Sequence, residues 1–493
     1  MAEIRSSRSE VPPRGDRGWV QVADGRSRER SLLAGEGSLH QRLEAGLREA
    51  IRSGGLRAGH LLPSTRGLAA DLGVSRGVVV EAYAQLRAEG WLEVRPGASH
   101  RVAEVSLDPT ADTGAAAAPV RPRHDLRPGG PDPLLFPRTR WAAAVRAVLR
   151  EADVTAFEYP DVLGAAALRR VLAAYLARVR GVRAAPDDVV VCAGVGHALA
   201  LAGRALHAAG ARRVAVEDPS HIGTRAVLRD AGLEVTPAPV DEHGLVVDAL
   251  PPASAVLVTP AHQFPTGAVL HPDRRAALVA WARRHDAVIL EDDYDAEYRY
   301  DRHPIGALQG LDPERVVYCG SVSKTLSPAL RLGWAVMPPR LRGAVAAARE
   351  RSDLGTATLD QLALARFIER GEYDRHLRSS RAAYRRRRDA LVAALHEHLG
   401  APRIGGVAAG LHLVLRIEGD ERAACEAAET AGIGHAAMAE HVISTDREPA
   451  LILGYGRVSE PALRAAAYAL AAALVGLERR SVASAHGPRP ASR

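Results

Sequence analysis

The sequence contains almost no lysine. Of its 65 basic residues, one is a lysine, Lys324, and the other 64 are arginines. Arginine can replace a lysine that only carries charge. It cannot replace a lysine that must lose its proton and attack a carbonyl, because arginine stays protonated. Lys324 is therefore retained either because its chemistry requires a lysine or by chance. The residues around it distinguish these two explanations.

Cysteines and long apolar runs are also scarce. The three cysteines, Cys192, Cys319 and Cys425, lie far apart without metal-ligand spacing, which indicates reduced thiols and predicts no metal site. No apolar run reaches the roughly 20 residues that cross a bilayer, and the polar first residues contain no apolar signal core. We therefore expect a cytoplasmic protein that does not engage a membrane.

The rest of the composition is typical of a globular protein with several domains: 493 residues, 47% hydrophobic and 25% charged. A formal charge of +7 permits binding to a polyanion but does not require it. Beyond about residue 126, short β-branched runs alternate with Ala-, Leu- and Arg-rich stretches, which predicts a large α/β domain. The expected divisions are a disordered tail (1–37), a small domain (38–105), a linker (106–125), the large domain (126–480) and a second disordered tail (481–493).

The small domain shows three helical patterns. The first has apolar residues at the spacing of one helix face, namely Leu39, Leu43, Leu47 and Ile51. The second can be capped by Ser64 or Thr65 and is broken by Gly73. The third covers residues 76–89, with Ser75 as its cap.

Two short extended runs, 91–94 and 101–105, follow these helices and predict a hairpin, or wing. This order of elements is that of a winged helix-turn-helix domain, whose last helix enters the major groove of DNA with its N-terminal residues nearest the bases. A small helical packing domain with solvated arginines is the alternative. The candidates for contact with double-stranded DNA are Ser75, Arg76, Gly77, Arg66 and Arg95.

The stretch LPSTRGLAADLGVSRGVVVEAYAQLRAEG resembles the GntR family of DNA-binding domains. That resemblance implies DNA contacts for Arg66, Ser75, Arg76 and Gly77, and for Gly97 in the wing. Family members often have threonine where Gly77 stands, so a methyl or hydroxyl contact is expected to be missing here.

Five short β-branched runs of the large domain each end in a polar loop. Ligands of open α/β sheets bind beyond the carboxyl ends of the strands, so these loops are expected to line one site. The five stretches are DDVVVCAGVGHALAL, VAVEDPSHIGTR, AVLVTPAHQFPTG, AVILEDDYDAEY and VVYCGSVSKTLSP.

The contents of these loops suit pyridoxal 5′-phosphate. Lys324 can form a Schiff base with its aldehyde, and a carboxylate such as Asp292 can keep the pyridinium nitrogen protonated. Tyr294 can donate a hydrogen bond to the ring oxygen O3′. The turn at 194–198 offers backbone amides at a helix N-terminus to the phosphate. Hydroxyls and a cation for the phosphate can come from Ser321, Ser323 and Arg331.

SVSKTLSPALRLG resembles the lysine loop of fold-type I aminotransferases. AHQFPTG and EDDYDAEY resemble the versions found in the MocR/GabR group, which joins a GntR winged helix to an aminotransferase-like domain. This resemblance covers most of the chain and implies a homodimeric transcriptional regulator with pyridoxal phosphate on Lys324. It gives Asp292, Tyr294, Ser321, Ser323 and Arg331 the cofactor contacts described above. It also implies that His262 lies near the ring and that Tyr159 reaches the phosphate of the neighbouring subunit.

Several positions depart from the pattern of that group. Gly196 and His197 stand where the phosphate turn usually carries glutamine, so backbone amides are expected to serve there. His221 replaces a tyrosine, although an imidazole can still stack on the cofactor ring. Phe264 stands where many active aminotransferases place an asparagine that forms a hydrogen bond with O3′. The absence of that asparagine favours sensing over efficient turnover.

The expected function is a regulator that senses an amino-bearing effector, or a vitamer of pyridoxal phosphate, through aldimine chemistry at Lys324. A carboxylate on the effector is best bound by an arginine that donates two parallel hydrogen bonds to it. Arg447 is the first candidate, with Arg225 and Arg457 as others. The alternative is a working aminotransferase with an accessory DNA-binding domain, and whether full transamination occurs is left open.

Overall fold

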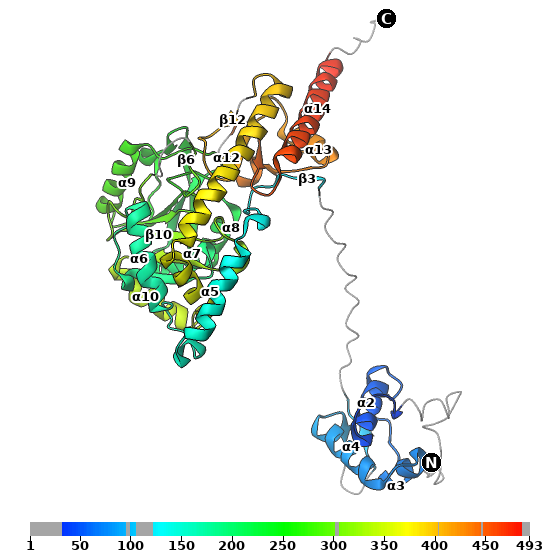
Figure 1. Ribbon diagram of the computed structural model, residues 1–493. Coiled ribbons are helices and arrows are strands. Elements are labelled where there is room, and N and C mark those ends of the chain that lie inside the picture. The colour runs from blue at the N-terminus through cyan, green and yellow to red at the C-terminus, as the bar shows by residue number, and fades with distance from the viewer. Residues whose placement is uncertain are drawn as a thin grey trace, which may run out of the picture. The chain divides into compact units, whose positions relative to one another are not determined.

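The computed structural model describes residues 32–94, 99–104, 122–300, 305–402, 404–444 and 447–485, with side chains up to residue 477 (Figure 1). The chain divides into two compact units, residues 1–119 and 120–493. The boundary between them falls within the stretch 106–125 that was expected to be a linker.

The first unit is a winged helix-turn-helix domain. Its hairpin pairs Leu92 with Val102 and Glu93 with Arg101 in antiparallel register. Leu32 and Leu33 pack against the core of this unit, which corrects the expectation of a tail up to residue 37. Its elements are α2 (Leu39–Arg52), α3 (Thr65–Leu72), α4 (Arg76–Ala88), β1 (Leu92–Glu93) and β2 (Arg101–Val102).

The ends of its helices follow from local sequence chemistry. Ser64 caps α3 by accepting a hydrogen bond from the Gly67 amide at 3.1 Å, which resolves the choice between Ser64 and Thr65. Gly73 ends α3 with φ 63°, a left-handed conformation that favours glycine. Ser75 caps α4 and accepts from the Val78 amide at 3.5 Å.

The second unit is built on an eight-stranded sheet. Its central strands are parallel, whereas β11 and β7 run antiparallel to their neighbours. In spatial order the strands are β4 (Val189–Cys192), β11 (Gly333–Val336), β10 (Val316–Ser321), β9 (Val288–Asp292), β8 (Ala255–Val258), β5 (Arg213–Asp218), β6 (Glu234–Asp241) and β7 (Gly244–Leu245).

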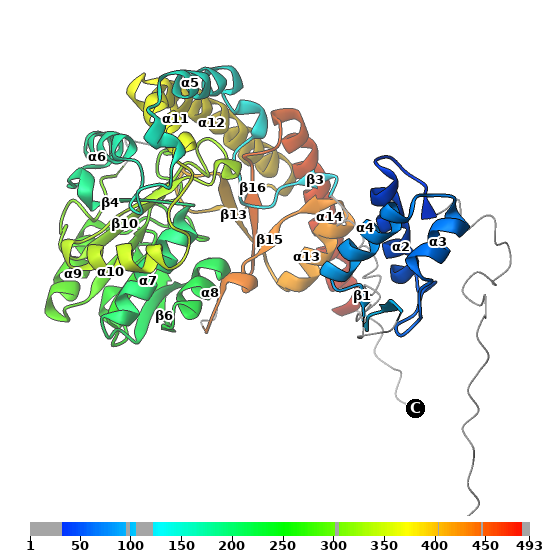
Figure 2. The ribbon, with the colours of Figure 1, turned by 90° about the horizontal axis from the view of Figure 1, so that it is seen from below.

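Helices cover both faces of this sheet, as Figure 2 shows. Alternate residues of β4 explain why, because Val189 and Val191 pack into one apolar cluster while Val190 and Cys192 pack into another. The helices around this sheet are α5 (Arg138–Glu151), α6 (Ala166–Arg180), α7 (Val195–Ala208), α8 (Ile222–Asp230), α9 (Pro272–Arg284), α10 (Pro339–Glu350) and α11 (Thr358–Glu369).

The C-terminal part of the same unit adds a second, smaller sheet in the order β12–β13–β16–β15. A parallel pair, β3 with β14, joins His124 and Asp125 to this part, so the last two residues of the expected linker 106–125 belong to the large unit. The elements are β3 (His124–Asp125), α12 (Glu372–Leu399), β12 (Ile404–Gly405), β13 (His412–Arg416), α13 (Glu421–Thr430), β14 (Ile433–Gly434), β15 (Ala436–Ala437), β16 (Ala450–Gly454) and α14 (Glu460–Ala485).

The last helix, α14, differs from expectation in length and composition. It runs to Ala485, five residues beyond the expected domain end at 480, and no glycine or proline stands between Leu477 and Gly487. Within the described residues it is the one helix long and apolar enough to cross a membrane, over Glu460–Leu477. Leu463 and Leu470 of this stretch pack into the core of the unit.

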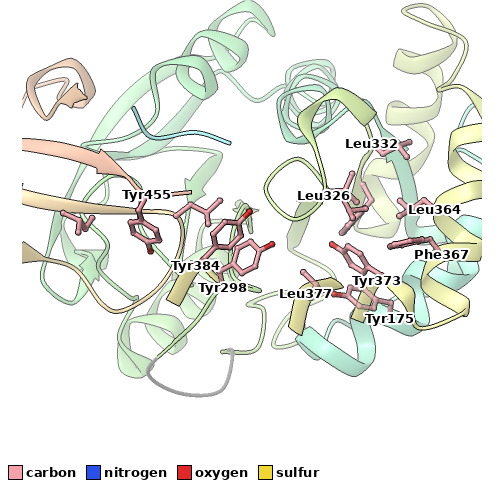
Figure 3. Close-up of a cluster of buried hydrophobic side chains, with 14 of the residues drawn as sticks. Tyr175, Tyr298, Leu326, Leu332, Leu364, Phe367, Tyr373, Leu377, Tyr384 and Tyr455 are labelled. Carbon is pink, nitrogen blue, oxygen red and sulfur yellow. The ribbon is translucent and has the colours of Figure 1, made fainter. Parts of the chain in front are cut away.

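The largest apolar cluster lies between α6, α11, α12 and the sheet, and Figure 3 shows its buried tyrosines, leucines and Phe367. Two tyrosine hydroxyls of this cluster form hydrogen bonds with Thr325, the residue after Lys324. The Tyr298 hydroxyl donates to the Thr325 carbonyl at 3.3 Å, and the Tyr373 hydroxyl pairs with the Thr325 hydroxyl at 2.8 Å. The core therefore fixes the backbone on which the single lysine stands.

Candidate functional site

A cavity of about 710 Å³ lies in the second unit, at the carboxyl ends of β4, β5, β8, β9 and β10. The five polar loops that were expected to meet are the loops that follow these strands. They meet because carboxyl ends of parallel strands share one edge of a sheet. Of the expected site residues, the cavity is lined by Lys324, Asp292, Tyr294, Ser321, Ser323, Arg331, Gly196 and His221.

Lys324 follows β10 in the wall of this cavity. Burial lowers the pKa of its amine, while the carboxylates of Asp295 and Asp292 act in the opposite direction. A lowered pKa raises the fraction of neutral amine, which is the form that attacks a carbonyl. The Lys324 amine also donates a hydrogen bond to the backbone carbonyl of Gly129.

Asp292, the last residue of β9, is 9% exposed, and its Oδ1 has no hydrogen-bond partner. Burial, reinforced by the neighbouring Asp293 and Asp295, raises the pKa of Asp292 to about 7. An isolated carboxylate in such a place is unfavourable unless a cation or a donor faces it. A protonated ring nitrogen supplies both, so this orphaned oxygen fits the pyridinium end of pyridoxal phosphate.

Tyr294 is held from behind by a histidine and an aspartate. The Tyr294 hydroxyl lies 3.0 Å from Nδ1 of His262, which also lies 3.0 Å from Oδ2 of Asp295. Burial raises the pKa of Tyr294 well above its usual range, so the phenol keeps its proton. His262 itself is 3% exposed and does not line the cavity. In this structure His262 orients Tyr294. The family resemblance implied that His262 itself lies near the cofactor ring.

The opposite end of the cavity is suited to an anion. Gly194 precedes α7 with φ 122°, and a Cβ added there would lie 3.6 Å from Nη1 of Arg331. The guanidinium of Arg331 therefore sits beside the free backbone amides of a helix N-terminus, a common phosphate site. Ser321 and Ser323 add their hydroxyls to the same wall, and Ser321 Oγ accepts from the Ser323 amide at 3.3 Å.

Several expected site residues lie elsewhere. The His197 imidazole turns away from the cavity, since its Nδ1 accepts from the Ala193 amide at 3.2 Å and its Nε2 faces Asp353 at 3.6 Å. Tyr159 is 88% exposed and does not line the cavity of its own chain.

Two of the three arginines proposed for an effector carboxylate, Arg225 and Arg447, do not line the cavity either, which corrects that expectation, while the third, Arg457, lies close enough to Lys324 for its charge to lower the pKa of the amine. Arg225 is 6% exposed and donates to the backbone carbonyls of His441 at 3.0 Å and Glu440 at 3.3 Å. Arg447 donates to the carbonyl of Asp218 and lines a separate cavity. Both arginines serve backbone acceptors that lie more than two hundred residues away in sequence, which local sequence does not reveal.

The cavity also contains residues that the sequence analysis did not select as site residues. Glu217 lines it, and burial raises the pKa of this carboxyl to about 7. His441 and the segment from Arg127 to Gly129 line it as well. Glu217 stands in one of the five quoted loops and could have been found there, whereas the other two lie outside those loops.

The expected DNA-contacting side chains of the first unit are free to meet a ligand. Arg66, Ser75, Arg76 and Gly77 are all exposed at the start of α3 or α4. Nε of Arg76 donates to Oγ1 of Thr65 at 3.4 Å, which steadies the side chain at the helix N-terminus. Arg95 and Gly97, predicted for the wing, lie outside the described residues.

Comparison with known families agrees with this division. Residues 39–102 match the family described as bacterial regulatory proteins, gntR family, and residues 132–473 match aminotransferase class I and II. Among solved structures, a multiple substrate aminotransferase from Thermococcus profundus aligns with a TM-score of 0.67 and 26% identity, over 72% of this chain and 92% of that one. An alanine:glyoxylate aminotransferase from an archaeon aligns with a TM-score of 0.67 and 23% identity, over 86% of this chain and 97% of that one.

Curated relatives share both units. The probable rhizopine catabolism regulatory protein MocR of Rhizobium meliloti is 34% identical over 89% of this chain and 94% of its own length. The pyridoxine biosynthesis transcriptional regulator PdxR of Corynebacterium glutamicum is 32% identical over 87% of this chain and 94% of its own. The chain therefore belongs to the MocR-type transcriptional regulators, which join a GntR helix-turn-helix domain to an aminotransferase class I and II domain.

Proposed function

We propose that this regulator holds pyridoxal 5′-phosphate on Lys324 and uses it to sense a primary amine, or a vitamer of the cofactor itself. The observation that carries the proposal is the unpartnered carboxylate oxygen of Asp292 in the cavity that also holds the single lysine. When bound, pyridoxal phosphate supplies an electrophilic carbon that amines compete for.

Different residues would bind the ring and the phosphate of the cofactor, at the two ends of the cavity. Asp292 would keep the ring nitrogen protonated, and Tyr294, oriented by His262, would donate to the ring oxygen. Arg331 and the amides at the start of α7 would hold the phosphate. The lowered pKa of the Lys324 amine raises the fraction of neutral amine, which is the form that attacks a carbonyl.

The segment around β3 connects this cavity along the chain to the expected linker. Gly129, which accepts a hydrogen bond from Lys324, lies shortly after β3, the strand His124–Asp125 at the end of the stretch 106–125. With the cofactor held on Lys324, its nitrogen would carry at most one N–H in place of the three of an ammonium, so fewer donors would remain for Gly129. We propose that the resulting shift of this segment alters how the winged helices engage an operator.

A homodimer is part of the same proposal. Large apolar side chains near α5 stand exposed on the second unit, an unusual feature for a free surface. They are Leu134, Leu149, Val154, Phe157 and Tyr159. A second copy of the chain would cover them, and Tyr159 could then reach the phosphate of its partner. The operator lies on chromosomal DNA, so we place the protein in the cytoplasm.

A working aminotransferase is the second candidate, because Lys324, Asp292 and Tyr294 are all present in the cavity. Steady turnover of an amino donor at about 1 per second or faster, within the range of ordinary enzymes, would favour it. The sensing proposal predicts instead that an amine changes the absorbance of the protein once and changes operator affinity without sustained product formation.

A further inference from the structure

His441 places an imidazole without a hydrogen-bond partner in the wall of the Lys324 cavity. The residue is 6% exposed, and neither Nδ1 nor Nε2 has a partner. The hydroxyl of Ser220, also 6% exposed, lines the same cavity and has no partner either. Buried polar atoms are nearly always paired, so two such side chains in one wall indicate that a ligand satisfies them.

The backbone around these two side chains is fixed. The His441 carbonyl accepts from the Ser220 amide at 3.0 Å and from Nη1 of the buried Arg225 at 3.0 Å. Arg225 is therefore a positioning residue that locks two loops together. With both loops held, His441 and Ser220 cannot easily withdraw to find other partners, and their free atoms are preorganised for a ligand.

The His441 imidazole is neutral near pH 7. Burial lowers its pKa to about 4, helped by His221 and by Arg225, while the backbone of Ser220 acts in the other direction. Burial also lowers the pKa of His221. A neutral imidazole offers one donor and one acceptor, and a serine hydroxyl can do both. The wall therefore carries hydrogen-bonding capacity of both kinds.

Aromatic rings enclose this polar spot. The Phe264 ring lies edge-to-face with His441 at 5.0 Å and with His221 at 5.6 Å between centroids. His221 and His441 are stacked at 6.5 Å. Such rings suit a short apolar stem that ends in a polar group. Glu440 and Arg225 contact this part of the wall through the chain and the backbone of His441, and Lys324 acts on His221 from across the cavity. Glu440 is exposed, and the side chain of Arg225 is used by backbone carbonyls.

We propose that His441 and Ser220, with His221 and Phe264 around them, select the effector, and that they take a primary amine bearing a distal uncharged hydroxyl. A hydroxyl donates and accepts at once, as this wall requires. A carboxylate only accepts and an ammonium only donates, and a neutral imidazole and a hydroxyl give neither of them a counter-charge, so burying either charge against this wall is unfavourable. This inference rests on the proposed sensing function and adds the chemical class of its ligand.

The test is a spectral titration of the full-length protein loaded with pyridoxal phosphate. The probes are terminal amino alcohols of two to six carbons and the alkylamines in which a methyl group replaces the hydroxyl. Amino acids and diamines of the same chain lengths present a carboxylate or an ammonium in place of the hydroxyl. At the best chain length we expect the amino alcohol to bind about tenfold more tightly than its methyl partner, the effect of one or two good hydrogen bonds.

His441→Phe keeps a flat ring but removes both nitrogens, and the affinity ratio between alcohol and methyl partner should fall to about one. Ser220→Ala gives a second variant that breaks no hydrogen bond within the protein, and it should lower the ratio by about threefold. His396→Phe, an exposed histidine on α12, is the matched control and should leave the ratio unchanged.

The outcomes separate this inference from the sensing function. Amines that bind without preferring the hydroxyl would overturn the inference and leave sensing intact, as would a preference for the amino acids or diamines. A wild-type preference that survives in both His441→Phe and Ser220→Ala would assign selection to other residues. A spectrum that no amine changes would overturn the sensing function and this inference together.

Discussion

Asp292→Asn should make the cofactor-free protein more stable at pH 8 while weakening its hold on pyridoxal phosphate. The ordinary pKa of an aspartate is 3.8, and burial with neighbouring carboxylates raises that of Asp292 to about 7. Because the folded state holds the proton more tightly than the unfolded state, stability falls as the pH rises between these two values. At about 1.4 kcal/mol for each pH unit, the full cost above pH 7 is about 4 kcal/mol.

Asparagine removes the charge and therefore this cost. In a domain of this size we expect the melting temperature of the cofactor-free variant to exceed that of the wild type by several degrees at pH 8. The difference should shrink as the pH falls from 7 toward 4, where the wild-type carboxyl becomes protonated. Calorimetry of both proteins at a series of pH values measures this directly.

The same variant should bind the cofactor poorly, because the ring nitrogen loses its counter-charge. Breaking a buried ion pair costs about 3–5 kcal/mol, so a loss of at least about a hundredfold in affinity for pyridoxal phosphate is expected in an absorbance titration. Asp273→Asn, an exposed aspartate on α9, is the matched control. A variant no more stable than wild type at pH 8 and unaltered in cofactor affinity would refute the role given to Asp292.

Three further predictions concern other parts of the molecule. Arg76→Ala should weaken operator binding by about 1–3 kcal/mol in a gel-shift assay, as for loss of a base-contacting arginine, while cofactor absorbance stays unchanged. Unaltered DNA affinity would exclude Arg76 from the interface. Phe367→Ala should destabilise the large unit by about 3–5 kcal/mol in chemical unfolding, because it empties a site that is 1% exposed in the main apolar cluster. An effect below about 1 kcal/mol would show that the core collapses around the cavity. Val154→Asp with Phe157→Ser should shift the protein toward a monomer in sedimentation, and an intact dimer would place the interface elsewhere.

The elements that sequence predicted well are those determined by local chemistry. Ser75 and Gly73 act as helix caps whose effect depends only on the residues beside them. The wing follows from two short extended runs around a turn. The meeting of the polar loops at strand ends also follows from sequence, because parallel strands bring those ends to one edge of a sheet.

The features that sequence did not reveal depend on partners far away along the chain. Arg225 looked like a ligand for a carboxylate, yet its acceptors are backbone carbonyls of Glu440 and His441. No side-chain pattern marks a carbonyl as an acceptor. His441 ends a single 3-10 turn, Ala439–His441, too short to show periodicity, and only the fold brings it to His221 and Phe264. The contacts of His262 with Asp295 and Tyr294 also join residues about thirty positions apart, and local sequence does not reveal them.

The most direct test of the account is operator binding by the wild type and by Lys324→Ala, each measured with pyridoxal phosphate and with or without an amine that changes the wild-type spectrum. We predict that the amine changes operator affinity of the wild type and has no effect on Lys324→Ala, which should also lack the visible absorbance of the loaded protein. An equal response of both proteins to the amine would contradict the claim that the single lysine is the sensor.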